Sequence, residues 1–140
     1  MSAYKTIECD IVDSDILLEA LKILNLSANK FEEPQSLRGY RDDLRQEKAE
    51  IIIPKEKIND FTGASNDIGF KWNSEAKKYD MIISDYDRAM HMDSRIIQAY
   101  VKVVLEKALE KNGFKIKVSI EDDLTKRKMN DLNIVARKII

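Results

Sequence analysis

The feature that most constrains the fold is the alternating stretch Asn-Asp-Ile-Gly-Phe-Lys-Trp-Asn at residues 66–73. Successive side chains of a strand point to opposite faces, so its three large apolar residues share one face and its charged residues share the other. A polar segment leads to a second stretch, Tyr-Asp-Met-Ile-Ile-Ser, at residues 79–84. The sequence therefore predicts an antiparallel hairpin with one buried face. Trp72, the only tryptophan, is expected to pack in the core with its strand neighbours.

Strand signals recur outside this hairpin. The other strands predicted from alternating or continuously apolar segments are residues 4–12, 37–40, 49–53, 114–120 and 132–140. Between these segments the signal is weaker: Phe31 is expected on a short strand that Pro34 ends, and residues 41–47 are expected to form a loop. Four strand signals in a row with short connections predict an antiparallel meander in the middle of the chain.

Two segments have apolar residues at helical spacing. The first begins at Asp13 or Ser14, either of which is a suitable N-cap, and the second runs from Asp93 or Ser94 to Lys111. The resulting order predicts an α+β fold, with a mainly antiparallel sheet of about six to seven strands, two helices on one face and an elaborated ferredoxin-like plan. Because a chain of 140 residues has the usual size of one domain, residues 1–140 are expected to form a single domain.

Composition excludes several activities. The net charge of −1 supplies no general attraction for nucleic acid, and Cys9 and His91 are the only residues of their types. One chain therefore holds no disulfide and no zinc site with two histidines. The sequence shows no apolar signal segment and no apolar run long enough to span a membrane, so we expect a cytoplasmic protein without a membrane partner or a cofactor.

The polar face of the predicted sheet is the first candidate site. Arg38, Tyr40, Lys71 and Asn73 are expected on this face, where they could bind an anionic group or a protein partner. No catalytic constellation or glycine-rich phosphate loop occurs in the sequence. These features favour a noncatalytic interaction or adaptor module over an enzyme.

A second candidate site uses carboxylates. Asp67, Asp85 and Asp87, together with His91, could hold a divalent cation or act as a metal-assisted hydrolase or small-ligand site. Solvated aspartates at strand ends are the alternative interpretation of the same residues. Trp72 likewise offers a stacking platform with Tyr79 if its ring is not buried.

The motifs are spread over the whole chain and resemble one family. They include Arg-Gly-Tyr at residues 38–40, Ala-Glu-Ile-Ile-Ile at 49–53, Asp-Ile-Gly-Phe-Lys-Trp-Asn at 67–73 and Asn-Ile-Val-Ala-Arg-Lys at 133–138. The sequence is similar to the hypothetical chloroplast reading frame thirty-five family of plastids, cyanobacteria, other bacteria and viruses. It departs from that family at residues 85–98, where relatives tend to have tryptophan-containing sequence.

The resemblance implies a shared fold and no defined activity, since the family is one of unknown function. It implies a protein partner, with an ATPase as one candidate. The apolar ending Ile139-Ile140 leaves a homo-oligomer open as an alternative to an ending that tucks into the core.

Overall fold

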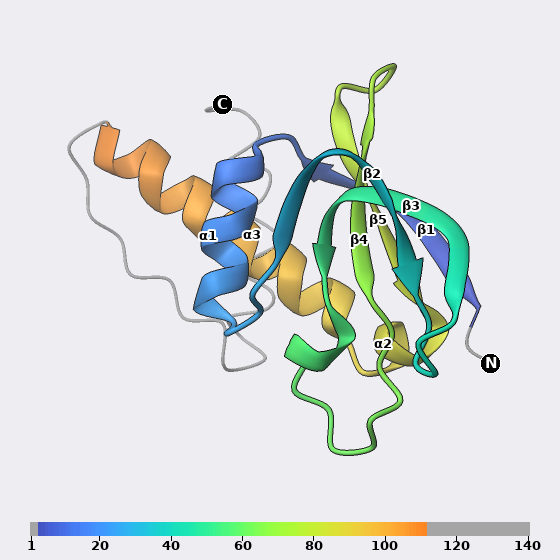
Figure 1. The fold of residues 1–140 in the computed structure, drawn as a ribbon. Coiled ribbons are helices and arrows are strands. Elements are labelled where there is room, and N and C mark those ends of the chain that lie inside the picture. The colour runs from blue at the N-terminus through green and yellow to red at the C-terminus, as the bar shows by residue number, and fades with distance from the viewer. Residues whose placement is uncertain (1–2, 112–140) are drawn as a thin grey trace.

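The structure is a computed structural model that describes residues 3–111, which form a curved antiparallel sheet with helices on one face (Figure 1). The elements in chain order are β1 (Tyr4–Ile11), α1 (Ser14–Ile23), β2 (Asn29–Arg38), β3 (Leu44–Ile53), the 3-10 turn η1 (Lys55–Lys57), β4 (Ile68–Asn73), β5 (Lys78–Ser84), α2 (Asp85–Ala89) and α3 (Met92–Lys111). The strand order is β1-β5-β4-β3-β2, and every neighbouring pair is antiparallel. Strands β2 to β5 therefore form the predicted meander.

The main core lies between the sheet and helices α1 and α3. The alternation of β4 and β5 places Phe70 and Met81 on this side of the sheet, where both are fully buried with Ile96 of α3. At the other end of the layer, the Tyr100 hydroxyl accepts hydrogen bonds from the backbone N–H groups of Val12 and Asp13, both at 3.1 Å. These contacts fix the chain between β1 and α1 against α3.

The opposite face of the sheet curls over a second, smaller core. Its buried members are Leu37, Ala49, Ile52 and Ile82, with the Tyr4 ring packed against them. Gly69 makes this curl compatible with close packing, because a Cβ there would lie 2.8 Å from the Ala49 Cβ. The β2–β3 hairpin arches across the sheet as a result (Figure 1). The Tyr4 hydroxyl of β1 donates a 3.0 Å hydrogen bond to the Arg38 carbonyl of β2, so the two outer strands approach each other.

The described residues confirm the α+β class and the antiparallel sheet, but they contain five strands and three helices. The predicted strands 114–120 and 132–140 lie outside the described residues, and the ferredoxin-like plan stays a prediction. Strand β2 continues through Pro34, which an edge strand tolerates, and the register between β2 and β3 shifts between Lys30 and Gln35. Residues 29–35 are all exposed, so they have no alternation for the sequence to reveal.

Two further expectations were wrong in detail, and one element was not predicted. Residues 44–47 belong to β3 rather than to a loop, and the sequence did not indicate α2 at all. The Trp72 side chain is 38% exposed, whereas core packing was expected. It continues the apolar face of β4, but it lies near the strand's end, where its ring makes an edge contact with Tyr79 at 4.9 Å between centroids.

Candidate functional site

Four polar residues are almost completely buried where β4 begins and β5 ends. These residues, Asn66, Asp67, Ser84 and Asp87, are between 0% and 2% exposed, and we call them the buried polar cluster. A buried polar group destabilises a protein unless it is hydrogen-bonded. The bonding partners of the cluster therefore show whether its chemistry is available to a ligand.

Asp67 is occupied by structural hydrogen bonds. Its Oδ2 accepts from the Arg38 backbone N–H at 2.8 Å and from Arg38 Nε at 3.2 Å, and its Oδ1 accepts from the Lys55 backbone N–H at 2.8 Å. The Arg38 guanidinium also donates a 2.8 Å hydrogen bond to Glu56 Oε2. This hydrogen bond from Arg38 holds the pKa of the Glu56 carboxyl below its ordinary value. Asp67 thus joins the end of β2 to the turn after β3.

Asp87 anchors the short helix α2, whose N-cap is Ser84. Its Oδ2 accepts from the Ser84 hydroxyl at 2.8 Å and from the Asn66 backbone N–H at 3.0 Å, while Ser84 Oγ accepts from the Asp87 N–H and from Asn66 Nδ2. Burial raises the pKa of the Asp87 carboxyl, and the hydrogen bonds from Asn66 and Ser84 oppose that rise. These bonds link the loop before β4 to the start of α2.

The predicted carboxylate site is divided between different environments. Asp67 and Asp87 belong to the buried polar cluster, whereas Asp85 and His91 are exposed. His91 has a positive φ of 63°, and its backbone joins α2 to α3. Within residues 3–111, no three His, Cys, Asp or Glu side chains come together as a metal site. The proposed roles of these four residues in binding a metal therefore stay a prediction.

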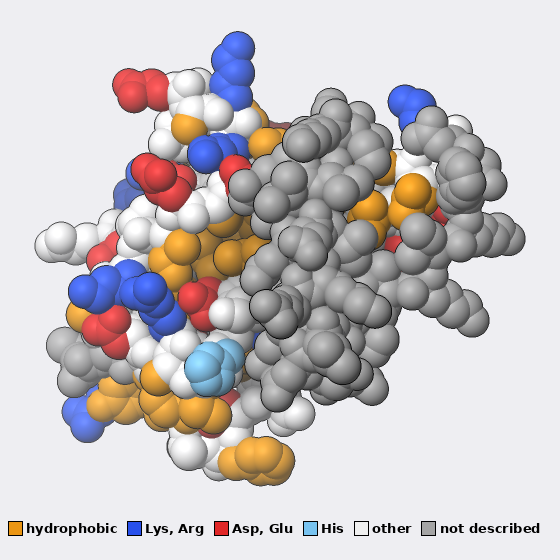
Figure 2. All heavy atoms as spheres, turned by 180° about the vertical axis from the view of Figure 1, so that it is seen from behind, with side chains coloured by type: hydrophobic (Ala, Val, Ile, Leu, Met, Phe, Trp, Pro, Cys, Tyr) orange, Lys and Arg blue, Asp and Glu red, His pale blue; other side chains and the backbone are white. Residues whose placement is uncertain are grey.

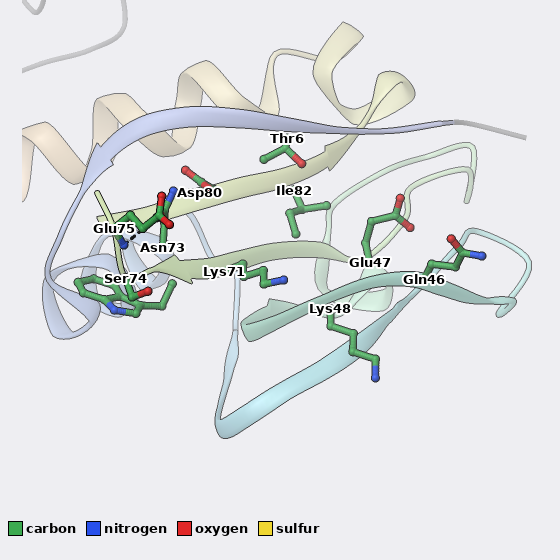
Figure 3. A pocket seen from close by; sticks show the side chains of 11 residues that line it. Thr6, Gln46, Glu47, Lys48, Lys71, Asn73, Ser74, Glu75, Asp80 and Ile82 are labelled. Atoms are coloured by element: carbon green, nitrogen blue, oxygen red, sulfur yellow. Dashed lines mark hydrogen bonds between the residues drawn. The ribbon is translucent and has the colours of Figure 1, made fainter. Parts of the chain in front are cut away.

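A groove lies at the other end of β4, on the face away from α1 and α3. It has a volume of about 550 Å³ and takes residues from β1, β3, β4, β5 and the β4–β5 turn. Its lining residues, which define the β4 groove, are Thr6, Gln46, Glu47, Lys48, Lys71, Trp72, Asn73, Ser74, Glu75, Asp80 and Ile82. Figure 3 shows Lys71 between the β3 side chains on one side and the turn residues on the other.

The β4 groove exists because β3 separates from β4 partway along. The two strands pair only where Ile51, Ile52 and Ile53 face residues 68–70, so residues 71–73 of β4 continue without β3 beside them. Those residues still pair with β5, where Lys71 lies opposite Asp80 and Trp72 opposite Tyr79. The groove therefore has a rigid hairpin as one wall.

Polar groups in the β4 groove differ in whether they form hydrogen bonds or ion pairs within the protein. Asn73 Oδ1 accepts from two backbone N–H groups in the turn, and its Nδ2 donates to Asp80 Oδ2 at 3.3 Å. Within the described part of the chain, the ammonium groups of Lys48 and Lys71 form no hydrogen bond or ion pair. The groove thus presents two free cations beside the carboxylates of Glu47, Glu75 and Asp80.

The four residues predicted to share the polar face of the sheet are therefore distributed over both ends of β4. Lys71 and Asn73 line the β4 groove, as the alternation of β4 suggested. Arg38 is instead bound to Asp67, and the Tyr40 backbone N–H donates to Asn66 Oδ1 at 2.9 Å. The contribution of residues 46–48 was not foreseen, because residues 41–47 were expected to form a loop and residue 48 was not assigned to a strand. Residues 45–48 are all polar, so no apolar alternation in the sequence marked them as a strand.

Comparison with known proteins identifies the family. Residues 20–127 match the family described as "Protein of unknown function (DUF1257)". The chain belongs to this family. The match covers the buried polar cluster and every lining residue of the β4 groove except Thr6, and the family description assigns no activity to either. No curated protein and no solved structure matches the chain.

Charge and hydropathy add two observations. In the view of Figure 2, basic and acidic side chains are interspersed over the described residues and do not gather by sign. None of the helices within residues 3–111 has the length and apolar character needed to cross a membrane.

Proposed function

We propose that this domain is a noncatalytic interaction module that binds a protein partner in the β4 groove. The observation that carries the proposal is a groove of about 550 Å³ built on a rigid hairpin, in which the Lys71 ammonium has no partner among the described residues. Polar groups that are already satisfied, such as Asp67, gain little from a ligand, whereas an unpaired ammonium gains a charge-assisted hydrogen bond.

The contrast with the buried polar cluster supports the choice of surface. Arg38 and Asp67 bond each other, and loss of either would disturb the fold before it disturbed recognition. Lys71 is exposed and can be replaced with little structural cost. Binding and stability are therefore separable at the β4 groove, as an interaction site requires.

Two finer assignments extend this proposal. The chain's kinship to the plastid and cyanobacterial reading-frame family remains our inference from the motifs at residues 38–40, 49–53 and 67–73. The expectations of a cytoplasmic location and a protein partner come from the sequence itself, and this kinship adds an ATPase as one candidate partner. The β4 groove supplies the surface on which such a partner would be tested first.

The test is capture of partners from native host extract by the tagged full chain, followed by mass spectrometry. Lys71→Glu reverses the charge in the middle of the β4 groove, and Lys57→Glu makes the same change at an exposed residue of η1 outside the groove. A partner that Lys57→Glu retains and Lys71→Glu loses supports the proposal. Retention of every partner by both variants would show that the β4 groove is not the interaction site.

A further inference from the structure

An unpaired strand edge lies inside the β4 groove. The register of β3 on β4 places Ile51 opposite Phe70, and continuing it by two residues would place Ala49 opposite Trp72. That pair does not form: Ala49 keeps its β2 partner, Gln35, on the other side of β3, but the pairing with β4 ends at Ile51. The edge of β4 at Trp72 is therefore left without a strand beside it in the described part of the chain.

A side chain occupies the position that a strand would take. The Trp72 backbone N–H donates a 3.2 Å hydrogen bond to Glu50 Oε1, so this N–H points toward the gap that β3 leaves. The N–H and C=O of one strand residue point to the same neighbour, so the Trp72 carbonyl faces the same gap. The Glu50 carboxylate thus accepts the bond that a backbone carbonyl accepts in a ladder.

The side chains on either side of this edge define what would fit. The side chains of a strand added beside β4 alternate in step with those of β4. One residue of the added strand then lies beside Lys71 on the groove face, and the next lies beside Trp72 on the opposite face of the sheet. Lys71 offers an unpaired ammonium and Trp72 a ring that is 38% exposed. Asp80 is directed to Asn73, and the carboxylates of Glu47 and Glu75 also line the groove, but Lys71 is the group in its middle (Figure 3), and its ammonium favours an anionic neighbour.

We propose that the partner binds by β-strand addition, with an extended segment that carries an acidic residue followed by an apolar residue. The segment lies along residues 71–73 of β4, and its backbone carbonyl replaces the Glu50 carboxylate on the Trp72 N–H. Its acidic side chain pairs with Lys71, and its apolar side chain covers the Trp72 ring. Main-chain hydrogen bonds then provide affinity and the two side-chain positions provide specificity, as in other strand-addition complexes.

The experiment uses a phage-displayed library of random seven-residue peptides, selected on the full chain. Selected peptides are synthesised and titrated while the emission of Trp72, the only tryptophan, is followed. We expect an acidic–apolar pattern, a shift of the emission to shorter wavelength as the ring is covered, and at least a tenfold weaker affinity when one central amide is N-methylated. Selection on Lys71→Glu should replace the acidic residue with a basic one, while selection on Lys57→Glu should return the original pattern.

Peptides that tolerate N-methylation at every position, or that leave the Trp72 emission unchanged, would overturn strand addition. Failure to enrich any peptide over the bare support would overturn it as well. The inference rests on the proposed function, but the two fail separately. If Lys71→Glu loses the partner from extract while N-methylation has no effect, the interaction site stands and the strand mode is wrong. If Lys71→Glu keeps every partner, the proposed function itself is wrong.

Discussion

The two ends of β4 carry similar polar sequence and have opposite environments. At the start of the strand, Asn66 and Asp67 are buried and bonded to residues from β2, the turn after β3 and α2. At its end, Lys71 is exposed, and the Trp72 N–H is satisfied only by the side chain of Glu50. The first end is fixed by the fold, and the second end is left available by it.

The difference teaches that a polar residue indicates a binding site only when its hydrogen bonds are unfilled. Strand β3 produces the contrast, because it accompanies β4 along residues 68–70 and then turns away over Gly69. Substitutions along β4 should therefore change stability most at its start and least at its end. The following predictions test that gradient.

The largest loss is expected from Asp67→Ala. Removing this carboxylate leaves the backbone N–H groups of Arg38 and Lys55 without their acceptor and the Arg38 guanidinium without its buried partner. The expected decrease in the free energy of unfolding is about 3–5 kcal/mol, as measured by urea denaturation. Glu56→Ala is the matched control, because the Glu56 side chain is 53% exposed and bonds the same Arg38.

The control should change stability by no more than about 1 kcal/mol. Equal losses for Glu56→Ala and Asp67→Ala would mean that surface charge, and not the buried polar cluster, holds the start of β4. Partner capture by Asp67→Ala, measured under conditions where the variant is folded, should match that of the wild type.

Asp87→Asn should give a smaller loss that depends on pH. The folded protein raises the pKa of the Asp87 carboxyl by burial, so the folded state holds its proton more tightly than the unfolded state does. This contribution to stability is present at low pH and is lost as the pH rises above the ordinary aspartate range. The gap in unfolding free energy between wild type and variant should therefore be wider at about pH 4 than at pH 7. A gap that widens toward neutral pH would contradict the direction of the shift.

Gly69→Ala tests the curvature that separates the two ends. The new Cβ would lie 2.8 Å from the Ala49 Cβ and 2.9 Å from Leu37 Cδ2, so the second core must shift. Overpacking of this kind costs about 1–3 kcal/mol, measured by urea denaturation. In a double-mutant cycle, Leu37→Ala should make Gly69→Ala less costly, because it removes the two Leu37 methyl groups that the new Cβ meets and leaves only the contact with Ala49. Independent, additive losses would show that the contact with Leu37 is not limiting.

The sequence predicted the parts of the fold that depend on periodicity. Strands β1, β4 and β5, the end of β3 and helices α1 and α3 each combine regular apolar spacing with a cap or a breaker, and each was placed to within a few residues. Strand β2 was obscured because its first seven residues are exposed on both faces. Helix α2 was missed because its five residues depend on tertiary contacts, such as the bond from the Asn66 N–H to Asp87.

The candidate site was predicted only where one strand determines it. Lys71 and Asn73 share a face of β4 by simple alternation, and they do lie together. Arg38 and Tyr40 were grouped with them by polarity alone, and no local pattern could show that Asn66 and Asp67 would bind them. Strand β3 stops pairing with β4 at Ile51, which opens the β4 groove, and the close approach of Ala49 to Gly69 beside this point is a long-range contact that no local pattern shows.

The smallest change in stability is expected from Trp72→Ala, at the end of β4. A buried tryptophan loses about 3–5 kcal/mol on truncation to alanine. This ring is 38% exposed, and its aromatic contact is an edge contact with Tyr79. We therefore expect a smaller loss in the free energy of unfolding: about 1 kcal/mol from the aromatic contact, in addition to the contribution of the apolar area that the ring buries. Trp72→Phe, which keeps an apolar ring, should fall between the wild type and Trp72→Ala in urea denaturation. A loss as large as that of Asp67→Ala would show that the end of β4 is as much a part of the fold as its start, and the contrast on which the interaction site rests would disappear.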